Sequence, residues 1–179
     1  MPDSEETERT RTITWADPSE VVHHVRRLSG ADLMEKMRLG EIPEPPFAKL
    51  LGIEVFDAGE GTVTMTLPPQ EMHYNPMGCV HGGILSTLLD TVMSAAIHSV
   101  LPAGRGYLTL SLNVNFLRPV YEHTGEIMAQ GQVVSMGRQI ATAEGRVMDV
   151  KGNVCATGTA TCLLMDIGRR KPEAEPKVD

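Results

Sequence analysis

The alternation of apolar and polar residues predicts two strands, one long helix and then four more strands. The first two strand patterns cover 53–56 and 62–67 and flank the turn signal Gly59-Glu60-Gly61. The strongest helix candidate covers 83–100, about five turns at 3.6 residues per turn. The later strand patterns lie at 108–116, 126–136, 138–150 and 154–165. In the first of these every second residue is apolar, which predicts that five residues share one face: Leu108, Leu110, Leu112, Val114 and Phe116.

The order of these elements predicts an α+β domain. Successive strands joined by short turns pair antiparallel. One face of such a sheet must be covered, and the helix at 83–100 is the only candidate for that cover in the pattern. We therefore expect an antiparallel sheet curled around one central helix.

The residues that precede this domain predict an accessory extension. Met1 to Thr12 is polar and charged and is expected to be disordered. Asp17-Pro18 and Ser29 are N-cap signals for two short helices, the second of which ends at Gly40. The proline-rich run 42–46 predicts a stiff linker. We expect three parts: a helical extension at 1–46, the α+β domain at 47–165 and a flexible tail at 166–179.

Composition and charge narrow the choice of partners and compartment. A net charge of −7 and a pI near 5.4 argue against nucleic acid as a partner. The longest apolar stretch is interrupted by Asp90 and several small polar residues, and the chain starts without an apolar leader, so we expect neither a membrane span nor secretion. Three cysteines without a CxxC pair predict free thiols: Cys79, Cys155 and Cys162. The cytoplasm is the expected compartment.

The helix at 83–100 carries a single formal charge, Asp90. A surface helix of this length usually has a stripe of charged residues on its wet side. Here the polar positions on one face are small, which predicts packing against protein on that side too: Thr87, Asp90, Thr91, Ser94 and His98. An enclosed carboxylate is costly unless it is hydrogen-bonded, and such groups are often functional. The alternative is that Asp90 is solvated or caps a neighbouring backbone.

The start of this helix is the second candidate for chemistry. It follows the turn 75–78 and begins at His81-Gly82-Gly83. Glycines at a helix start leave backbone N–H groups unshielded at the positive end of the helix dipole, as an oxyanion hole for acyl transfer requires. The alternative is a tight turn or close backbone packing.

The run Asn75-Pro76-Met77-Gly78-Cys79-Val80-His81-Gly82-Gly83, with Asp90 following in Leu88-Leu89-Asp90, resembles the PaaI-like hotdog-fold acyl-CoA thioesterases. The resemblance extends over 47–165. The run 113–119 is similar to the family's central strand, and 125–127 to its next strand. The resemblance implies the hotdog fold, in which an antiparallel sheet wraps one long helix. It also implies hydrolysis of an acyl-CoA thioester to a free acid and CoA.

Residue by residue, the resemblance implies the following roles. Asp90 acts as general base toward water or as nucleophile, and the Gly82 N–H polarises the thioester carbonyl. Asn75 positions the thioester or the water, His81 orients the loop, and Thr109 holds the water. The CoA would be met by small and basic residues: Gly83, Arg118, Ser135, Gly137 and Arg138. No metal and no cofactor is expected, since CoA is part of the substrate.

Spacing along the helix adds a prediction of quaternary structure. Gly82 and Asp90 are eight residues apart, about 12 Å of helical rise, and a side chain recovers only a few ångströms of that distance. Both groups must approach one thioester carbonyl. We therefore expect a dimer whose sites combine Gly82 of one subunit with Asp90 of the other. The resemblance implies the same pairing, often assembled into tetramers.

Four other interpretations of the function are open. Cys79 could act as nucleophile with His81 or His73, and His73, Cys79 and His81 could bind a metal, although a fourth ligand is missing. A hotdog dehydratase acting on 3-hydroxyacyl thioesters is the nearest enzymatic alternative. A non-catalytic acyl-CoA-binding module is the alternative from another class. The acyl group stays open too, because eleven Met and 4% aromatic residues suit medium-chain acyl and arylacetyl groups equally.

Overall fold

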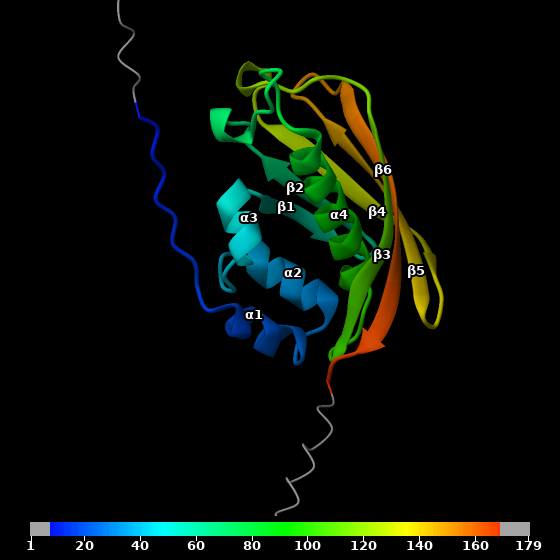
Figure 1. Ribbon diagram of the computed structural model, residues 1–179. Coiled ribbons are helices and arrows are strands. Elements are labelled where there is room, and N and C mark those ends of the chain that lie inside the picture. The colour runs from blue at the N-terminus through cyan, green and yellow to red at the C-terminus, as the bar shows by residue number, and fades with distance from the viewer. Residues whose placement is uncertain (1–7, 169–179) are drawn as a thin grey trace, which may run out of the picture.

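The computed structural model describes residues 8–168, which form a six-stranded antiparallel sheet curled around one long helix (Figure 1). The strand order is β1-β2-β4-β5-β6-β3. The central helix α4 is Gly82–Ser99, and the strands are β1 Glu54–Gly59, β2 Thr62–Leu67, β3 Arg105–Phe116, β4 Ile127–Met136, β5 Ile140–Met148 and β6 Val154–Asp166. The predicted order of elements and the α+β hotdog fold are confirmed.

Three glycines let α4 lie close to the sheet. Gly131 of β4 pairs with Gly145 of β5, which pairs with Gly158 of β6, so the three form a row across the strands. A Cβ added at Gly131 would lie 2.5 Å from the carbonyl oxygen of Val92, and one at Gly145 would lie 2.8 Å from Cγ of Met93. The absence of side chains along this row is therefore what allows α4 to contact the strand backbones.

Apolar side chains on the sheet-facing sides of α4 fill the remaining space of the core. They are fully buried, and each contributes roughly 1.5–3 kcal/mol by leaving water: Leu88, Leu89, Val92, Met93 and Ile97. Two of its polar residues, Thr87 and Thr91, donate to the carbonyl oxygens four residues earlier. The helix thus lies between the sheet and α2 of the N-terminal extension.

Strand β3 corrects one prediction. Its register shifts between Thr109 and Ser111, which pair with Cys162 and Thr161, so Leu110 is an extra residue in a β-bulge. Because a one-residue insertion reverses the alternation, Leu108 and Leu110 point away from the helix and are 54% and 58% exposed. The prediction that all five apolar residues of this strand share one face is wrong. The bulge instead puts Thr109 on the helix side.

The N-terminal extension packs on the C-terminal half of α4. Its helices are α1 Pro18–Val25 and α2 Gly30–Arg38, and the short helix α3 Pro46–Leu51 follows at the start of the α+β domain. Asp17 and Ser29 cap α1 and α2 as predicted, with Ser19 N–H donating to Asp17 Oδ1 at 2.8 Å. Gly30 lies so close to the His98 carbonyl oxygen that an added Cβ would be 1.6 Å away. This contact fixes where α2 sits, and Leu33 and Met34 of α2 join the core of the sheet.

The described part of the N-terminal segment contacts the body of the protein. Residues 8–12 have no helix or strand, but Arg9 contacts Glu71 of the short 3-10 helix η1 (Glu71–His73), and Arg11 contacts Gln70, the residue that caps it. The remainder of the segment expected to be disordered, 1–7, and residues 169–179 of the expected flexible tail lie outside the described residues. No helix between residues 8 and 168 is both long and apolar enough to cross a membrane.

The glycine row makes a testable prediction. Gly131→Ala should lower the free energy of unfolding by about 1–3 kcal/mol, because the added carbon meets the backbone of α4 and the helix must move. Gly59→Ala is the matched control in the same sheet, where the new carbon comes closest to the rotatable Thr62 hydroxyl, at 3.0 Å, and meets backbone only at 3.9 Å. Urea denaturation followed by circular dichroism measures both. Equal urea midpoints for Gly131→Ala and Gly59→Ala would contradict the role of the glycine row in helix packing.

Candidate active site

Asp90 lies in the middle of α4, half-buried, with its carboxylate turned toward β3. The hydroxyl of Thr109 donates to its Oδ1 at 2.8 Å. Thr109 is the residue immediately before the bulge, so the irregularity of β3 is what presents this hydroxyl to the helix. One carboxylate oxygen is thus fixed, while Oδ2 has no hydrogen-bond partner within residues 8–168.

The surroundings of Asp90 form a narrow polar seam between α4 and β3. Ser94 follows one turn later on α4, and Tyr107 precedes Thr109 by two residues on β3. Cys162 of β6 lies 3.9 Å from the Thr109 hydroxyl. Burial raises the pKa of the Tyr107 phenol and of the Cys162 thiol, so both stay protonated at neutral pH.

The turn before α4 is built by Asn75. Its side-chain Oδ1 accepts from Met77 N–H at 2.8 Å and from Cys79 N–H at 3.4 Å, and its backbone N–H donates to the Cys79 carbonyl at 2.8 Å. These bonds close an Asx turn. The side-chain Nδ2 reaches only the Cys79 thiol, at 3.4 Å. In the structure Asn75 thus shapes the turn, and its side-chain Nδ2 is the atom available to contact a ligand.

His81 caps the helix. Its Nδ1 accepts from Gly83 N–H at 2.8 Å, so Nδ1 carries no proton and the Gly83 N–H is occupied. The N–H of Gly82, one residue earlier, donates to no group within residues 8–168. Of the two glycines, Gly82 therefore presents the unpaired donor at the positive end of α4.

A cavity of about 320 Å³ opens at this helix start. It is lined by four of the residues singled out from the sequence: Asn75, Cys79, Gly82 and Arg118. Phe116, which sequence reasoning did not select, stacks on Gly82, where an added Cβ would be 2.9 Å from its ring. Its only signal in the sequence was its place at the end of a strand. Arg118 borders the same cavity and donates to the Val154 carbonyl at 2.6 Å.

The remaining site residues do not meet in one chain. Asp90 does not line the cavity at Gly82, and the two residues are separated by eight positions of one continuous helix, about 12 Å of rise. Ser135 lies near the end of β4, and Gly137 and Arg138 lie in the turn from β4 to β5, where Arg105 donates to the Arg138 carbonyl. Arg105 and Phe116 are the two ends of β3, so this turn lies a full strand length from Gly82.

The geometry does not favour the cysteine and metal readings. Cys79 contacts Asn75, and no histidine lies within hydrogen-bond distance of it within residues 8–168. His73 is buried with its Nδ1 accepting from Gln70 N–H, and burial lowers its pKa. In the part of the chain that the structure describes, no three His, Cys, Asp or Glu side chains gather as metal ligands.

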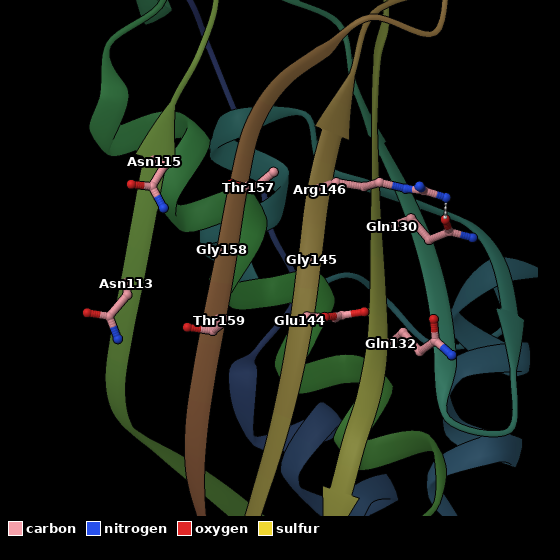
Figure 2. Close-up of a pocket in the computed structure, with 10 residues that line it drawn as sticks. All are labelled: Asn113, Asn115, Gln130, Gln132, Glu144, Gly145, Arg146, Thr157, Gly158 and Thr159. Atoms are coloured by element: carbon pink, nitrogen blue, oxygen red, sulfur yellow. Dashed lines mark hydrogen bonds between the residues drawn. The ribbon is translucent and has the colours of Figure 1, made fainter.

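A second cavity, of about 360 Å³, lies on the outer face of the sheet (Figure 2). Figure 2 shows its polar side chains on the face opposite α4, including Arg146, which donates to Gln130 at 2.7 Å. Register places them in two rows: Gln132, Glu144, Thr159 and Asn113, and Gln130, Arg146, Thr157 and Asn115. Since neither Asp90 nor Gly82 lines it, this cavity is separate from the candidate site.

Comparisons with known proteins identify the family of the chain. The family model of the thioesterase superfamily matches residues 77–156, which include Gly82, Asp90 and Thr109. A "Putative esterase" of Halobacterium salinarum is 37% identical over 99 residues, which cover 52% of this chain and 64% of that protein, just under two thirds of its length.

Solved structures extend the likeness over most of the chain. The phenylacetic acid degradation-related protein of Ralstonia eutropha JMP134, a "putative thioesterase", is 30% identical with a TM-score of 0.67, over 73% of this chain and 98% of that one. The Escherichia coli PaaI protein, at 24% identity, shares the fold, with a TM-score of 0.66 over 77% of this chain and 96% of that one. The chain therefore belongs to the thioesterase superfamily, among the PaaI-like hotdog proteins.

Proposed function

We propose that the protein hydrolyses an acyl-CoA thioester to a free acid and CoA. Family membership supports thioester hydrolysis in general. The observation that carries the proposal is the pairing of two features of α4: a carboxylate held by Thr109 in mid-helix, and an unpaired Gly82 N–H at the helix start. The first suits a base or nucleophile and the second suits an oxyanion hole.

The proposed reaction uses each group once. The thioester carbonyl oxygen accepts from Gly82 N–H, and the positive end of the helix dipole stabilises the charge that develops there. Asp90 takes a proton from water as the water oxygen attacks the carbonyl carbon, and the CoA thiolate leaves as the carbonyl re-forms. In the nucleophilic variant, the Asp90 carboxylate attacks the carbonyl carbon and expels the CoA thiolate, and water then hydrolyses the resulting mixed anhydride to the free acid and the Asp90 carboxylate. Thr109 orients the carboxylate in both.

The site is proposed to be shared between two subunits, because one straight helix cannot bring Gly82 and Asp90 to the same carbonyl. The edge strand β3 supports this pairing. It is twelve residues long, carries Thr109, and is last in the strand order. An exposed edge of that length is suited to pairing with a second copy. Further assembly into a tetramer is part of the proposal.

The pairing would also reunite the residues predicted to bind CoA. Arg118 lies beside Gly82, and the turn with Ser135, Gly137 and Arg138 lies at the other end of β3. Antiparallel pairing of two β3 strands brings the far end of one subunit to the near end of the other. Gly83 would contribute only by close approach, since its N–H is occupied by His81. Three free thiols support the cytoplasm as compartment, and a net charge of −7 argues against nucleic acid as a partner.

The first prediction concerns Asp90. Asp90→Asn keeps the shape and an acceptor for Thr109 but removes the base or nucleophile, so kcat for acyl-CoA hydrolysis should fall on the order of 10²–10⁴-fold. Thr109→Val removes only the orienting hydrogen bond and should cost about tenfold. Thiol release from an acyl-CoA panel measures both, and thermal melting controls for folding. An Asp90→Asn protein whose kcat is within threefold of the wild-type value would contradict the catalytic role of Asp90. If neither the wild type nor Asp90→Asn hydrolyses any substrate of the panel, the non-catalytic binding module is favoured.

The second prediction isolates the Gly82 N–H. Gly82→Pro deletes that donor at the first helical position, where proline is tolerated, and the extended His81 before it is compatible with proline. Activity should fall about 10²–10³-fold. Gly82→Ala is the matched control, because it adds a carbon against Phe116 but keeps the N–H. If alanine and proline reduce kcat equally, the loss comes from the Phe116 contact and the N–H has no catalytic role.

A further inference from the structure

The outer face of strands β3 to β6 is open. In Figure 1 the α-helices lie on the inner side of the sheet, so none of them covers this face. Although 22% of the chain is charged, the outward residues of these four strands, apart from the strand ends, carry a formal charge only at Glu144 and Arg146. The others are amides, hydroxyls and apolar residues. Depletion of charged residues is typical of the central part of a protein interface.

Exposed apolar side chains lie on the same face. Leu108 of β3 pairs with Leu163 of β6, which pairs with Ile140 of β5, so the three form a row across the strands. Leu108 is 54% exposed and Ile140 is 42% exposed. A face that combines few charges with neighbouring exposed apolar groups is better suited to contact with protein than to contact with water alone.

The two polar rows that line the outer cavity match each other strand by strand (Figure 2). β4 contributes a glutamine to each row, β6 a threonine and β3 an asparagine, whereas β5 contributes a glutamate to one row and an arginine to the other. The rows are two residues apart along each strand, about 7 Å. The backbones of Gly145 and Gly158 lie between them and line the same cavity.

The two charges of this face do not neutralise each other within one chain. Glu144 makes no ion pair and no side-chain hydrogen bond within residues 8–168, and Arg146 donates only to Gln130, at 2.7 Å. One charge lies on each side of the line through Gly145 and Gly158. A half-turn about that line exchanges the positions of the two charges, so the face is complementary in charge to a second copy of itself.

We propose that this outer face binds a second copy of the chain, back to back, about a twofold axis that runs between the two sheets along the row of Gly145 and Gly158. Glu144 then meets Arg146 of the partner subunit, and the same pair forms a second time across the axis. Each glutamine, threonine and asparagine meets its own kind, and these side chains can both donate and accept. Face-to-face sheets keep their strands within about 30° of each other, so the rows stay opposed over the central strands.

This contact is distinct from the proposed pairing of β3 edges. It uses the face of the sheet, and neither Asp90 nor Gly82 lines the cavity at its centre. A chain that pairs through its β3 edge and through its outer face has two separate contacts, as a tetramer built from two dimers requires. The inference does not depend on the proposed reaction.

Exchange of the two charges tests the arrangement. Glu144→Arg places arginine opposite Arg146 of the partner subunit, and Arg146→Glu places glutamate opposite Glu144 of the partner subunit. Each single change should raise the dissociation constant of the contact about 100-fold or more, because two pairs worth about tenfold each give way to repulsion. The double variant, Glu144→Arg with Arg146→Glu, restores both pairs in reverse and should associate like the wild type.

Light scattering during gel filtration, over a dilution series, measures the mass of each protein. Each single variant should have half the wild-type mass, whether or not the subunits also pair through β3, and the double variant should recover the full mass. Glu126→Arg is the matched control, because it makes the same change of charge at an exposed residue directly before β4 and should leave the mass unchanged.

Circular dichroism establishes that each variant is folded. Single variants that keep the wild-type mass throughout the dilution series would overturn the inference, and so would a double variant that stays at half mass. A Glu126→Arg protein that also dissociates would assign the effect to net charge and not to the outer face, and would overturn it too. None of these measurements uses turnover, so the outcome for the contact is separate from the outcome for the proposed function.

Discussion

The close contact between α4 and the sheet is the constraint from which the rest of the structure follows. It depends on three cross-strand glycines, Gly131, Gly145 and Gly158, that leave no side chain between the strands and the helix. Packed interiors do not adjust easily to an added carbon when the neighbour is backbone. The helix is consequently fixed in position along its length, with its start at the Asn75 turn and its end against Gly30 of the extension.

A fixed, straight helix also fixes the spacing of the chemical groups on it. The Gly82 N–H and the Asp90 carboxylate cannot converge within one chain, and the cavity at the helix start contains the first and not the second. The two ends of α4 have different surroundings. The cavity at its start contains the Gly82 N–H and Arg118, and the apolar cleft at its end contains His98. In the function proposed above, acyl transfer therefore requires the helices of two subunits.

Much of the fold could be predicted from the sequence because its signals are local. The caps at Asp17 and Ser29, the hairpin glycines and the strand alternation each depend on a few neighbouring residues, and the structure confirms these elements. The β3 bulge could not be predicted in this way. Leu110 is a leucine like Leu108 and Leu112, so nothing in the pattern marks it as the extra residue. The pairing of β3 with β6 determines which residue of β3 forms the bulge.

The candidate site was partly accessible to the same reasoning. Asp90 stood out as the one charge on its helix, and Gly82 and Asn75 as parts of a turn, and the structure does place Gly82, Asn75 and Arg118 around one cavity. Ser135, Gly137 and Arg138 can reach that cavity only from a second subunit, and the sequence pattern of one chain does not predict how two subunits pair. The free N–H of Gly82 and the Phe116 ring upon it, as well as the unpaired nitrogens of His98, are properties of tertiary packing.

Hybrid dimers of Asp90→Asn and Gly82→Pro subunits test the shared site most directly. In such a dimer one site inherits both changes and the other inherits neither, provided that the donor and the carboxylate come from different subunits. Co-expressed subunits with different tags, purified in two affinity steps, should then have about half the kcat of the wild-type dimer, although each parent is nearly inactive. Purified hybrids that fold and dimerise but are as inactive as their parents would show that both groups act within one chain, and would contradict the account.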